Sequence, residues 1–235
     1  SRTVPLVSKV CNIRMVPLAT DIITSELTGR PSPVPELKEQ KIPYYGVKEA
    51  VFPFNMFPEV DPVLGPEMRS TGEVLGLSES YGEAFFKAQE AASLKLPLEG
   101  TVLISVNKKD KAEVVDVAKR FNEDGFKIIA TGKTCDLLNE SGIPAEKVKK
   151  LYEGRPNILD MITNGKIDLV VNSPAGKESV HDDSYLRKAA IKAKIPYMTT
   201  IAAAKATAEG IGYVKAHMEE NNEVKSLQQM HSEIK

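Results

Sequence analysis

The chain has 235 residues, of which 42% are hydrophobic and 27% charged, as expected of a globular protein with one large domain or two small ones. Its net charge of −1 does not indicate binding to nucleic acid or to an anionic membrane surface. No apolar run approaches the roughly 18 residues of a membrane span. Two cysteines without metal-ligand spacing and no signal-peptide core predict a reduced, cytoplasmic protein. Because a strand-like run begins almost at once, without an initiating methionine, we expect a fragment of a longer chain.

The first 98 residues do not have the pattern of a complete domain. Apolar residues at helical spacing predict a helix over 16–29, and a linker with four prolines follows in 31–43. Four more prolines interrupt the apolar stretch 44–76, which predicts short strands joined by turns. A second helix is predicted over 78–93, with Ser80 and Glu83 at the spacing of a capping box. These elements make a thin core, so we expect an incomplete α+β remnant of a larger fold.

Residues 99–235 have a regular alternation of apolar runs and helical stretches. The five runs, each followed by a helix, are 101–106, 126–131, 148–152, 167–172 and 196–200, and a last helix over 223–235 is expected to dock the tail. Repeated β-then-α units imply right-handed crossovers and an α/β domain with a five-stranded, doubly wound parallel sheet. In such a sheet ligands bind outside the carboxyl ends of the strands, near the topological switch point.

The triplet Gly132-Lys133-Thr134 after the second run resembles part of an ATP-binding phosphate loop. That loop needs a glycine five positions before its Gly-Lys pair. The position is occupied by Lys127, inside the apolar run. The spacing therefore excludes a Walker loop and leaves a strand, a tight turn and a helix start rich in hydroxyls.

Hydroxyls, amides and lysines follow the predicted strands, and these groups coordinate phosphate. They are Ser105, Asn107, Lys108, Lys109 and Lys111 after the first strand, Thr131, Gly132, Lys133 and Thr134 after the second, Lys149 and Lys150 at the third, Asn172 and Ser173 after the fourth, and Thr199 and Thr200 after the fifth. Helix N-termini would add their dipoles to such a site. Ordinary helix caps and solvated lysines are the alternative interpretation of the same residues.

The sequence offers no catalytic or metal constellation. It contains no H-x-x-x-H pair, no clustered cysteines, no G-x-S-x-G elbow and no paired carboxylates at the strand ends. A binding site without an evident acid, base or nucleophile favours sensing over chemistry.

Several stretches resemble one known family. PFNMFPEVDPVLGPEMRSTGEVLG and SRTVPLVSK are similar to the end of the second ATP-grasp half of the bacterial-type carbamoyl-phosphate synthase large chain. FKIIATGKT, YEGRPNILDMI, DLVVNSPAGK and SLQQMHSEIK resemble its C-terminal regulatory domain, which has the methylglyoxal-synthase-like fold. The resemblance covers essentially the whole chain. It implies an ATP-grasp remnant over 1–98 and an allosteric domain over 99–235.

The family implies a glutamine-dependent enzyme that makes carbamoyl phosphate for pyrimidine and arginine synthesis. Its ATP and Mg or Mn ions would be held upstream of this chain, so no catalytic residue, metal or cofactor is expected here. A glutaminase small chain and an oligomeric state are implied for the full enzyme. The effectors that the family implies are a nucleoside monophosphate, UMP or IMP, and the activator ornithine.

Carried over residue by residue, the resemblance defines two sets of effector-binding positions. The nucleotide set is Ser105, Lys111, Thr131, Gly132, Thr134, Lys150, Asn172 and Lys177, and the ornithine set is Glu49, Tyr197 and Thr199. Pro174 stands where some members have a hydroxyl, and Lys177 where arginine is common, which replaces a bidentate fork by a point charge.

Two alternatives remain open at this point. Methylglyoxal synthase shares the fold and would act as a lyase on dihydroxyacetone phosphate, but it needs a carboxylate beside the phosphate, and the segment NSPAGKE lacks the Asp-Pro pair expected there. The other alternative is a structural module that mediates oligomer contacts, with the polar strand ends serving only as caps.

Overall fold

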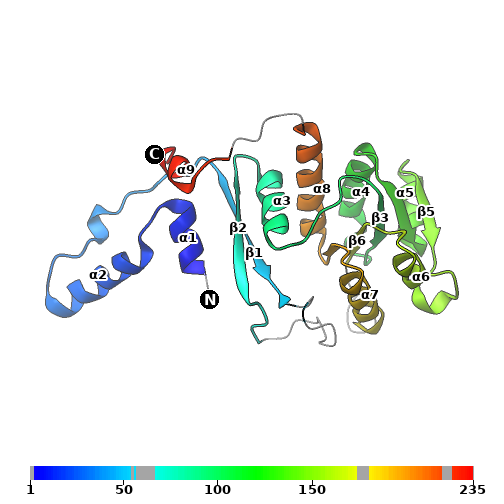
Figure 1. Ribbon diagram of the computed structural model, residues 1–235, viewed down its shortest axis with the longest axis horizontal. Helices are drawn as coiled ribbons and strands as arrows, with labels where there is room; N and C mark the ends of the chain where they lie inside the picture. The colour runs from blue at the N-terminus through cyan, green and yellow to red at the C-terminus, as the bar shows by residue number, and fades with distance from the viewer. Residues whose placement is uncertain (1–2, 54–55, 57–66, 174–179, 219–223, 235) are drawn as a thin grey trace.

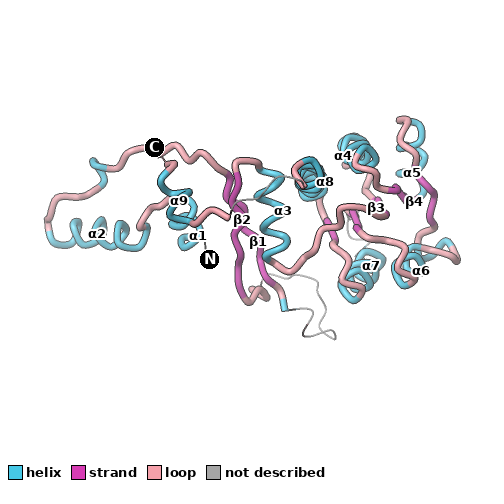
Figure 2. Tube along the Cα trace, turned by 45° about the horizontal axis from the view of Figure 1, so that its top comes forward, coloured by secondary structure: helices cyan, strands magenta, loops and turns pink. Residues whose placement is uncertain are grey.

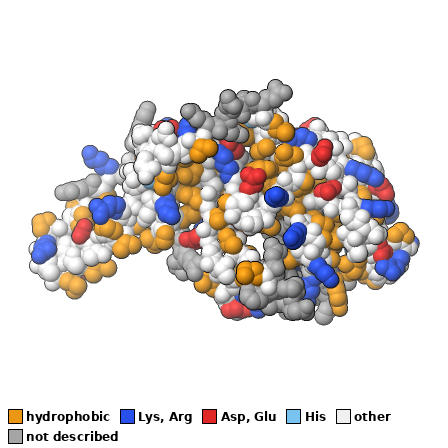
Figure 3. Space-filling view, in the orientation of Figure 1, with side chains coloured by type: hydrophobic (Ala, Val, Ile, Leu, Met, Phe, Trp, Pro, Cys, Tyr) orange, Lys and Arg blue, Asp and Glu red, His pale blue; other side chains and the backbone are white. Residues whose placement is uncertain are grey.

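The computed structural model describes residues 3–53, 56, 67–173, 180–218 and 224–234. The molecule is elongated (Figure 1): the first and last helices of the chain lie toward one end, a two-stranded sheet with its helix in the middle, and a five-stranded sheet with its helices at the other end. On the face seen in Figure 3, basic and acidic side chains are interspersed over the five-stranded part, in keeping with the net charge near zero. Within the described residues, no helix is both long and apolar enough to cross a membrane.

The N-terminal end is helical. The strand expected at the start is wrong, because Thr3–Cys11 forms helix α1, in which Leu6, Val7 and Val10 recur at helical spacing on the less exposed side. The next prediction is confirmed: helix α2 spans Met15–Thr28 and ends at Gly29, whose φ of 69° suits a glycine. A 3₁₀ turn, Val34–Glu36, is the structured part of the proline linker.

The short strands predicted next are confirmed where the structure describes them. Strands β1, Tyr45–Val51, and β2, Gly72–Ser78, pair antiparallel. Most of the proline-interrupted stretch between them lies outside the described residues. Helix α3, Tyr81–Ala91, packs directly on β2, because Gly76 has no side chain: a Cβ there would lie 2.0 Å from the Ala84 carbonyl oxygen.

The capping box predicted at the start of α3 is wrong. Ser80 is the N-cap residue, but its side chain makes no capping hydrogen bond. Ser78, two residues earlier, takes that part: its hydroxyl donates to the Glu83 carboxylate and accepts the Ser80 N–H at 3.1 Å. The spacing rule located the helix start correctly but missed a serine that reaches forward from the end of β2.

The five-stranded parallel sheet is confirmed. Its strands are β3 Thr101–Ser105, β4 Lys127–Thr131, β5 Ala145–Val148, β6 Leu169–Asn172 and β7 Tyr197–Met198, in the order β5-β4-β3-β6-β7. The third strand lies three residues earlier than predicted, and Leu151–Glu153 forms a 3₁₀ turn instead. As an edge strand, β5 exposes Glu146 and Lys147, so its residues lack the apolar signal that marks the inner strands.

Helices cover both faces of this sheet, as a doubly wound fold requires (Figure 2). On one face lie α4 Lys111–Glu123, α5 Gly132–Glu140 and α8 Ile201–Ala216, and on the other α6 Ile158–Thr163 and α7 Val180–Lys192. The side chains of β3 illustrate the division: Val102 and Ile104 join one apolar cluster, and Leu103 joins the other. Alternate strand residues therefore supply two separate cores.

Helix α3 joins the two parts of the molecule through close contact with α8. Gly82 and Gly210 meet there, since a Cβ on Gly210 would lie 2.6 Å from the Gly82 carbonyl oxygen. Phe85 and Phe86 of α3 belong to the same apolar cluster as buried side chains of α4 and α8. The core of the five-stranded part thus continues onto α3. The boundary between residues 98 and 99 stays a prediction.

The last helix, α9, is shorter than expected and spans Leu227–Ser232. It contacts α1 at the far end of the molecule, where the ring nitrogen Nε2 of His231 lies 2.5 Å from the Lys9 carbonyl oxygen. Lys225 pairs with both Glu79 and Glu233. The C-terminal segment therefore returns to the N-terminal helices (Figure 1).

Candidate functional site

The carboxyl ends of β4, β3 and β6 bring three of the predicted nucleotide residues together. Ser105 lies opposite Asn172 in the register of β3 and β6, and the Thr131 hydroxyl donates to Ser105 Oγ at 3.0 Å. Thr131 and Asn172 are each only 3% exposed. The switch point of the sheet is the boundary between β3 and β6, so these residues lie where an open α/β sheet binds its ligands. We call Ser105, Thr131 and Asn172 the rim triad.

The hydrogen bond of Thr131 bears on the alternative that this residue is an ordinary helix cap. Thr131 is the N-cap residue of α5, yet its side chain makes no capping bond and turns to Ser105 instead. Thr200 does what an ordinary cap does: its hydroxyl accepts the N–H of Ala203 at 3.1 Å at the start of α8. Within the described residues, the first turn of α5 therefore keeps backbone N–H groups without a side-chain partner. Thr134, in that turn, is buried, and a Cβ on Gly132 would meet no atom within 4 Å.

Two other polar residues of this edge are structural. Ser173 Oγ accepts the backbone N–H of Asn107 at 3.1 Å and its Nδ2 at 3.2 Å, which ties the loops after β3 and β6 together. The Asn107 carbonyl oxygen Oδ1 accepts the N–H groups of Lys109 and Asp110. Asp110 is the N-cap residue of α4, but its side chain makes no capping hydrogen bond and its carboxylate accepts from Asn107 Nδ2 at 2.8 Å. These bonds join the loops that follow Ser105 and Asn172.

Two of the three lysines of the nucleotide set lie at the starts of helical elements at this same edge. Lys111, half-buried, is the first residue of α4 and makes no ion pair within the described part of the chain. Lys150, also half-buried, follows β5, and its ammonium lies 6.0 Å from the centre of the Tyr152 ring. Lys177 lies outside the described residues. A groove of about 400 Å³ runs between α4 and α5 from this edge, lined by Lys111, Ala112, Val115, Lys133, Asp136, Leu137 and Glu140.

Tyr197, from the ornithine set, contacts the rim triad directly. Asn172 Nδ2 donates to the Tyr197 hydroxyl at 2.7 Å. The guanidinium of Arg187 lies over the Tyr197 ring, with its carbon 5.9 Å from the ring centre. Sequence reasoning missed Arg187 because it lies in the middle of α7, away from any strand end, and only the fold places it beside β7.

Glu49, also from the ornithine set, is half-buried on β1. Burial raises the pKa of its carboxyl group, while hydrogen bonds from Gln89 Nε2 at 2.7 Å and from the Ala50 N–H partly oppose that rise. Thr199 follows β7 and is exposed. Gln89, which binds the Glu49 carboxylate, lies on α3, the helix that packs against α8. Val47, also on β1, packs on the apolar cluster that contains Met198 of β7.

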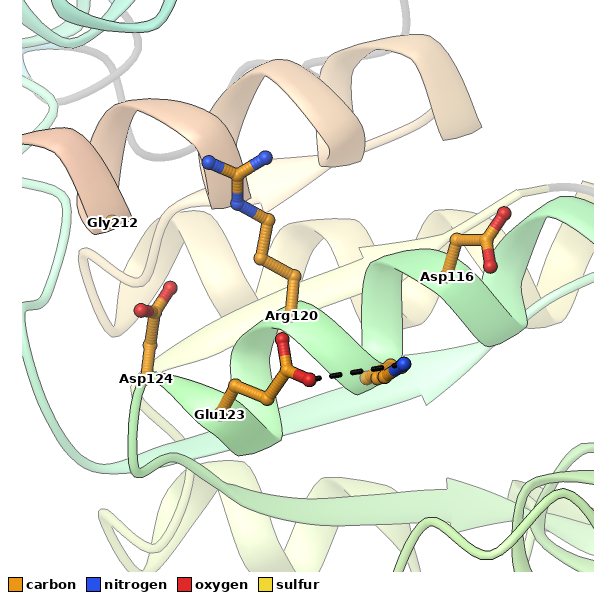
Figure 4. A pocket seen from close by; sticks show the side chains of 6 residues that line it. Asp116, Arg120, Glu123, Asp124 and Gly212 are labelled. Carbon is orange, nitrogen blue, oxygen red and sulfur yellow. Dashed lines mark ion pairs between the residues drawn. The ribbon is translucent and has the colours of Figure 1, made fainter.

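A second, charged groove of about 430 Å³ lies between the last turns of α4 and α8 (Figure 4). It is lined by Asp116, Lys119, Arg120, Glu123, Asp124 and Gly212. Burial raises the pKa of Asp124, against the opposing charges of Lys215 and Arg120. Since α4 runs antiparallel to the strands, this groove lies at the amino edge of the sheet, away from the rim triad. Within the described residues, no group of three or more His, Cys, Asp or Glu is placed to hold a metal ion.

The fold and its polar edge define the class of this part of the chain. Residues 113–199 match the family described as MGS-like domain. Among solved structures, methylglyoxal synthase from Elizabethkingia anophelis NUHP1 is 22% identical with a TM-score of 0.41, covering 48% of this chain and 79% of that one. A likeness at that level carries no functional conclusion.

Similarity over the whole length identifies the particular family. The carbamoyl phosphate synthase large chain of Methanothrix thermoacetophila is 43% identical over 236 residues, covering 100% of this chain and 21% of the relative. The carbamoyl phosphate synthase large chain, C-terminal section, of Methanopyrus kandleri is 48% identical over 224 residues, covering 92% of this chain and 40% of the relative. The chain belongs with the carbamoyl phosphate synthase large chains and corresponds to their C-terminal section. It spans about a fifth of the full-length relatives that it matches.

Proposed function

We propose that this chain is the effector-binding region of a carbamoyl phosphate synthase large chain. A nucleoside monophosphate, UMP or IMP, binds with its phosphate at the rim triad and the first turn of α5, and this binding controls carbamoyl phosphate synthesis. The observation that carries the proposal is the bond from Thr131 to Ser105. A buried hydroxyl at a helix N-terminus forgoes its capping bond and joins the neighbouring strand end, so the helix N–H groups stay available to an anion.

The number of hydrogen-bond donors proposed for this site is consistent with a dissociation constant in the micromolar range. Each charge-assisted hydrogen bond contributes about 1.5–3 kcal/mol, and the dipole of a helix N-terminus about 0.3–1 kcal/mol. Three such bonds with the α5 dipole reach the roughly 8 kcal/mol that corresponds to a micromolar dissociation constant. Lys111 and Lys150 would add positive charge at the same edge, and Lys177 is proposed as a further cation.

Ornithine is proposed as the second effector, recognised by Glu49, Tyr197 and Thr199. The half-buried carboxylate of Glu49 is suited to an ammonium group, whose charge would offset the burial that raises the Glu49 pKa. The other carboxylates that the ammonium group needs are expected upstream of this chain. Weak binding of ornithine by these 235 residues alone is therefore part of the proposal.

The activity of the whole protein is proposed from its relatives. A carbamoyl phosphate synthase large chain would work as a cytoplasmic, ATP-dependent ligase with a glutaminase small chain, with Mg or Mn ions bound upstream and with oligomer formation in the full enzyme. The exposed apolar side chains of Val16, Ile23 and Leu27 on α2 are consistent with residues 1–98 completing their packing against more of an ATP-grasp fold.

A ligand screen by thermal unfolding tests the proposal. UMP, IMP and inorganic phosphate are each added at increasing concentration, and a ligand at about 100 times its dissociation constant adds roughly 2.7 kcal/mol to the free energy of unfolding. A rise in melting temperature with UMP or IMP supports the proposal, and no rise with any of the three refutes it. Incubation with dihydroxyacetone phosphate and an assay for methylglyoxal separates the lyase alternative, which no feature of the described residues favours.

A further inference from the structure

Helix α7 contains a buried hydrogen-bond donor, in the side chain of Arg187, that lacks an acceptor among the described residues. The Nε atom of Arg187 is inaccessible to solvent and has no hydrogen-bond partner within the described part of the chain. Leaving a buried donor unpaired costs about 1–3 kcal/mol, and more when the group is charged. A guanidinium kept in such a position must be held by another interaction, and its place deserves a functional explanation.

That other interaction is with the ring of Tyr197. The guanidinium carbon lies 5.9 Å from the ring centre, within the range at which a cation is attracted to an aromatic face. The neighbours of Arg187 on α7, Leu186 and Ala190, are buried in the apolar cluster against which Tyr197 packs. Arginine suits this position because its planar, weakly hydrated group stacks on a ring at low desolvation cost. Arg187 therefore fixes where the phenol can lie.

The phenol of Tyr197 contacts the rim triad through a hydrogen bond from Asn172. The Tyr197 hydroxyl accepts from Asn172 Nδ2 at 2.7 Å, and Asn172 is 3% exposed. In the observed arrangement the amide presents its NH₂ group to the phenol oxygen, which accepts the bond, and a displaced ring would let the amide turn. The orientation of the Asn172 amide, opposite Ser105 in the sheet, thus depends on a ring held from α7.

We propose that Arg187 is a positioning residue of the anion site. It clamps the ring of Tyr197, and Tyr197 holds the Asn172 amide in the orientation that an anion meets at the rim triad. In this proposal Arg187 acts through these two residues: its guanidinium lies against the Tyr197 ring, and its Nε is inaccessible to solvent. The inference rests on the proposed function, since it assumes that an anion binds at Asn172.

Four single variants of the 235-residue chain, and the double variant Arg187→Met with Tyr197→Phe, test this role by titration calorimetry with UMP and with inorganic phosphate. Arg187→Met removes the charge and keeps the length, Arg187→Lys keeps a cation over the ring, and Tyr197→Phe keeps the ring and removes the hydroxyl. The exposed Lys192→Met, in the last turn of α7, is the matched control for loss of one positive charge from the same helix.

We expect Arg187→Met and Tyr197→Phe to weaken UMP binding about 5- to 10-fold each, the loss of one hydrogen bond's worth of free energy. The double variant should be no weaker than the weaker single one, because both changes act through the same bond. Arg187→Lys should recover most of the affinity, and Lys192→Met should bind as the unaltered chain does. The side-chain amide resonances of Asn172 should shift in Arg187→Met even without ligand.

The outcomes separate the two claims. If the unaltered chain binds neither UMP nor phosphate, the proposed function fails, and the role of Arg187 fails with it. If the unaltered chain binds while Arg187→Met binds equally well, only the role of Arg187 is overturned. Additive losses in the double variant, or an equal loss in Lys192→Met, also overturn it. Should Arg187→Met fail to fold, unaltered affinity in Tyr197→Phe overturns the proposal by itself.

Discussion

Asn172, at the end of β6, donates a hydrogen bond of 2.7 Å to the hydroxyl of Tyr197, at the start of β7. Asn172 was predicted to bind the nucleotide and Tyr197 to bind ornithine, so the two sets of effector residues touch. A ligand that draws the Asn172 amide toward itself changes the bond to Tyr197, and the reverse holds equally. From Tyr197, β7 leads through Thr200 into α8, which packs on α3 and through Gln89 reaches Glu49.

Thr131→Val is expected to weaken binding of UMP and of inorganic phosphate about tenfold, because it removes the bond that orients the Ser105 hydroxyl, a change of about 1.4 kcal/mol. Titration calorimetry measures the loss. Thr200→Val is the matched control: it removes a true helix cap at the same edge and should cost about 1 kcal/mol of stability without changing phosphate affinity. Equal losses of affinity in both variants would show that the rim triad has no special role.

Gly76→Ala is expected to destabilise the chain strongly, by about 3 kcal/mol or more, since overpacking against backbone leaves no rotamer that relieves it. The added Cβ would lie 2.0 Å from the Ala84 carbonyl oxygen and 2.7 Å from the Ala88 nitrogen. Gly72→Ala in the same strand is the control, because its Cβ would meet only Val51 at 4.0 Å. Chemical denaturation gives both values, and similar values would contradict the close contact of α3 with β2.

The pH dependence of stability should carry a contribution from Glu49, whose pKa in the folded chain is raised by burial. A raised pKa means that the folded state binds this proton more tightly than the unfolded state, so stability falls as pH rises from the ordinary pKa of a glutamate to the raised one, and then levels off. Glu49→Gln removes this contribution and keeps an acceptor for Gln89. The difference in unfolding free energy between the two chains should change across that interval, and a constant difference would contradict the assignment.

His231→Ala is expected to loosen α1, because the His231 ring reaches the Lys9 carbonyl at the end of α1. Hydrogen exchange should become faster for the amides of α1 and stay unchanged in β3 and β4, which lie at the other end of the molecule. Gln228→Ala, an exposed change on the same helix, is the control. Faster exchange throughout the chain would indicate global destabilisation instead of a local contact.

The inner strands and the rim triad were predictable, and the reasons are physical. β3, β4 and β6 are buried on both faces, so they appear as continuous apolar runs, and polar residues at their carboxyl ends must share one edge. Local sequence patterns gave the wrong element or the wrong hydrogen-bond partner where contacts between distant segments determine the structure. Thr3–Cys11 is a helix packed against α2 and α9, and Ser78 took the bond expected of Ser80.

Arg187 shows the limit of sequence reasoning most clearly. Its spacing within α7 is that of an ordinary half-exposed helix residue, and its contact with Tyr197 exists only because α7 packs beside β7. The link between Asn172 and Tyr197 was equally hidden, since these residues lie on neighbouring strands that a helix separates in the sequence.

The most direct test of the central claim is titration calorimetry of UMP and IMP into the unaltered chain and into Thr131→Val. We expect a dissociation constant in the micromolar range for at least one nucleotide, weakened about tenfold in the variant, as expected for the loss of one hydrogen bond. Absence of binding heat for UMP, IMP and inorganic phosphate, in a chain that unfolds cooperatively, would contradict it.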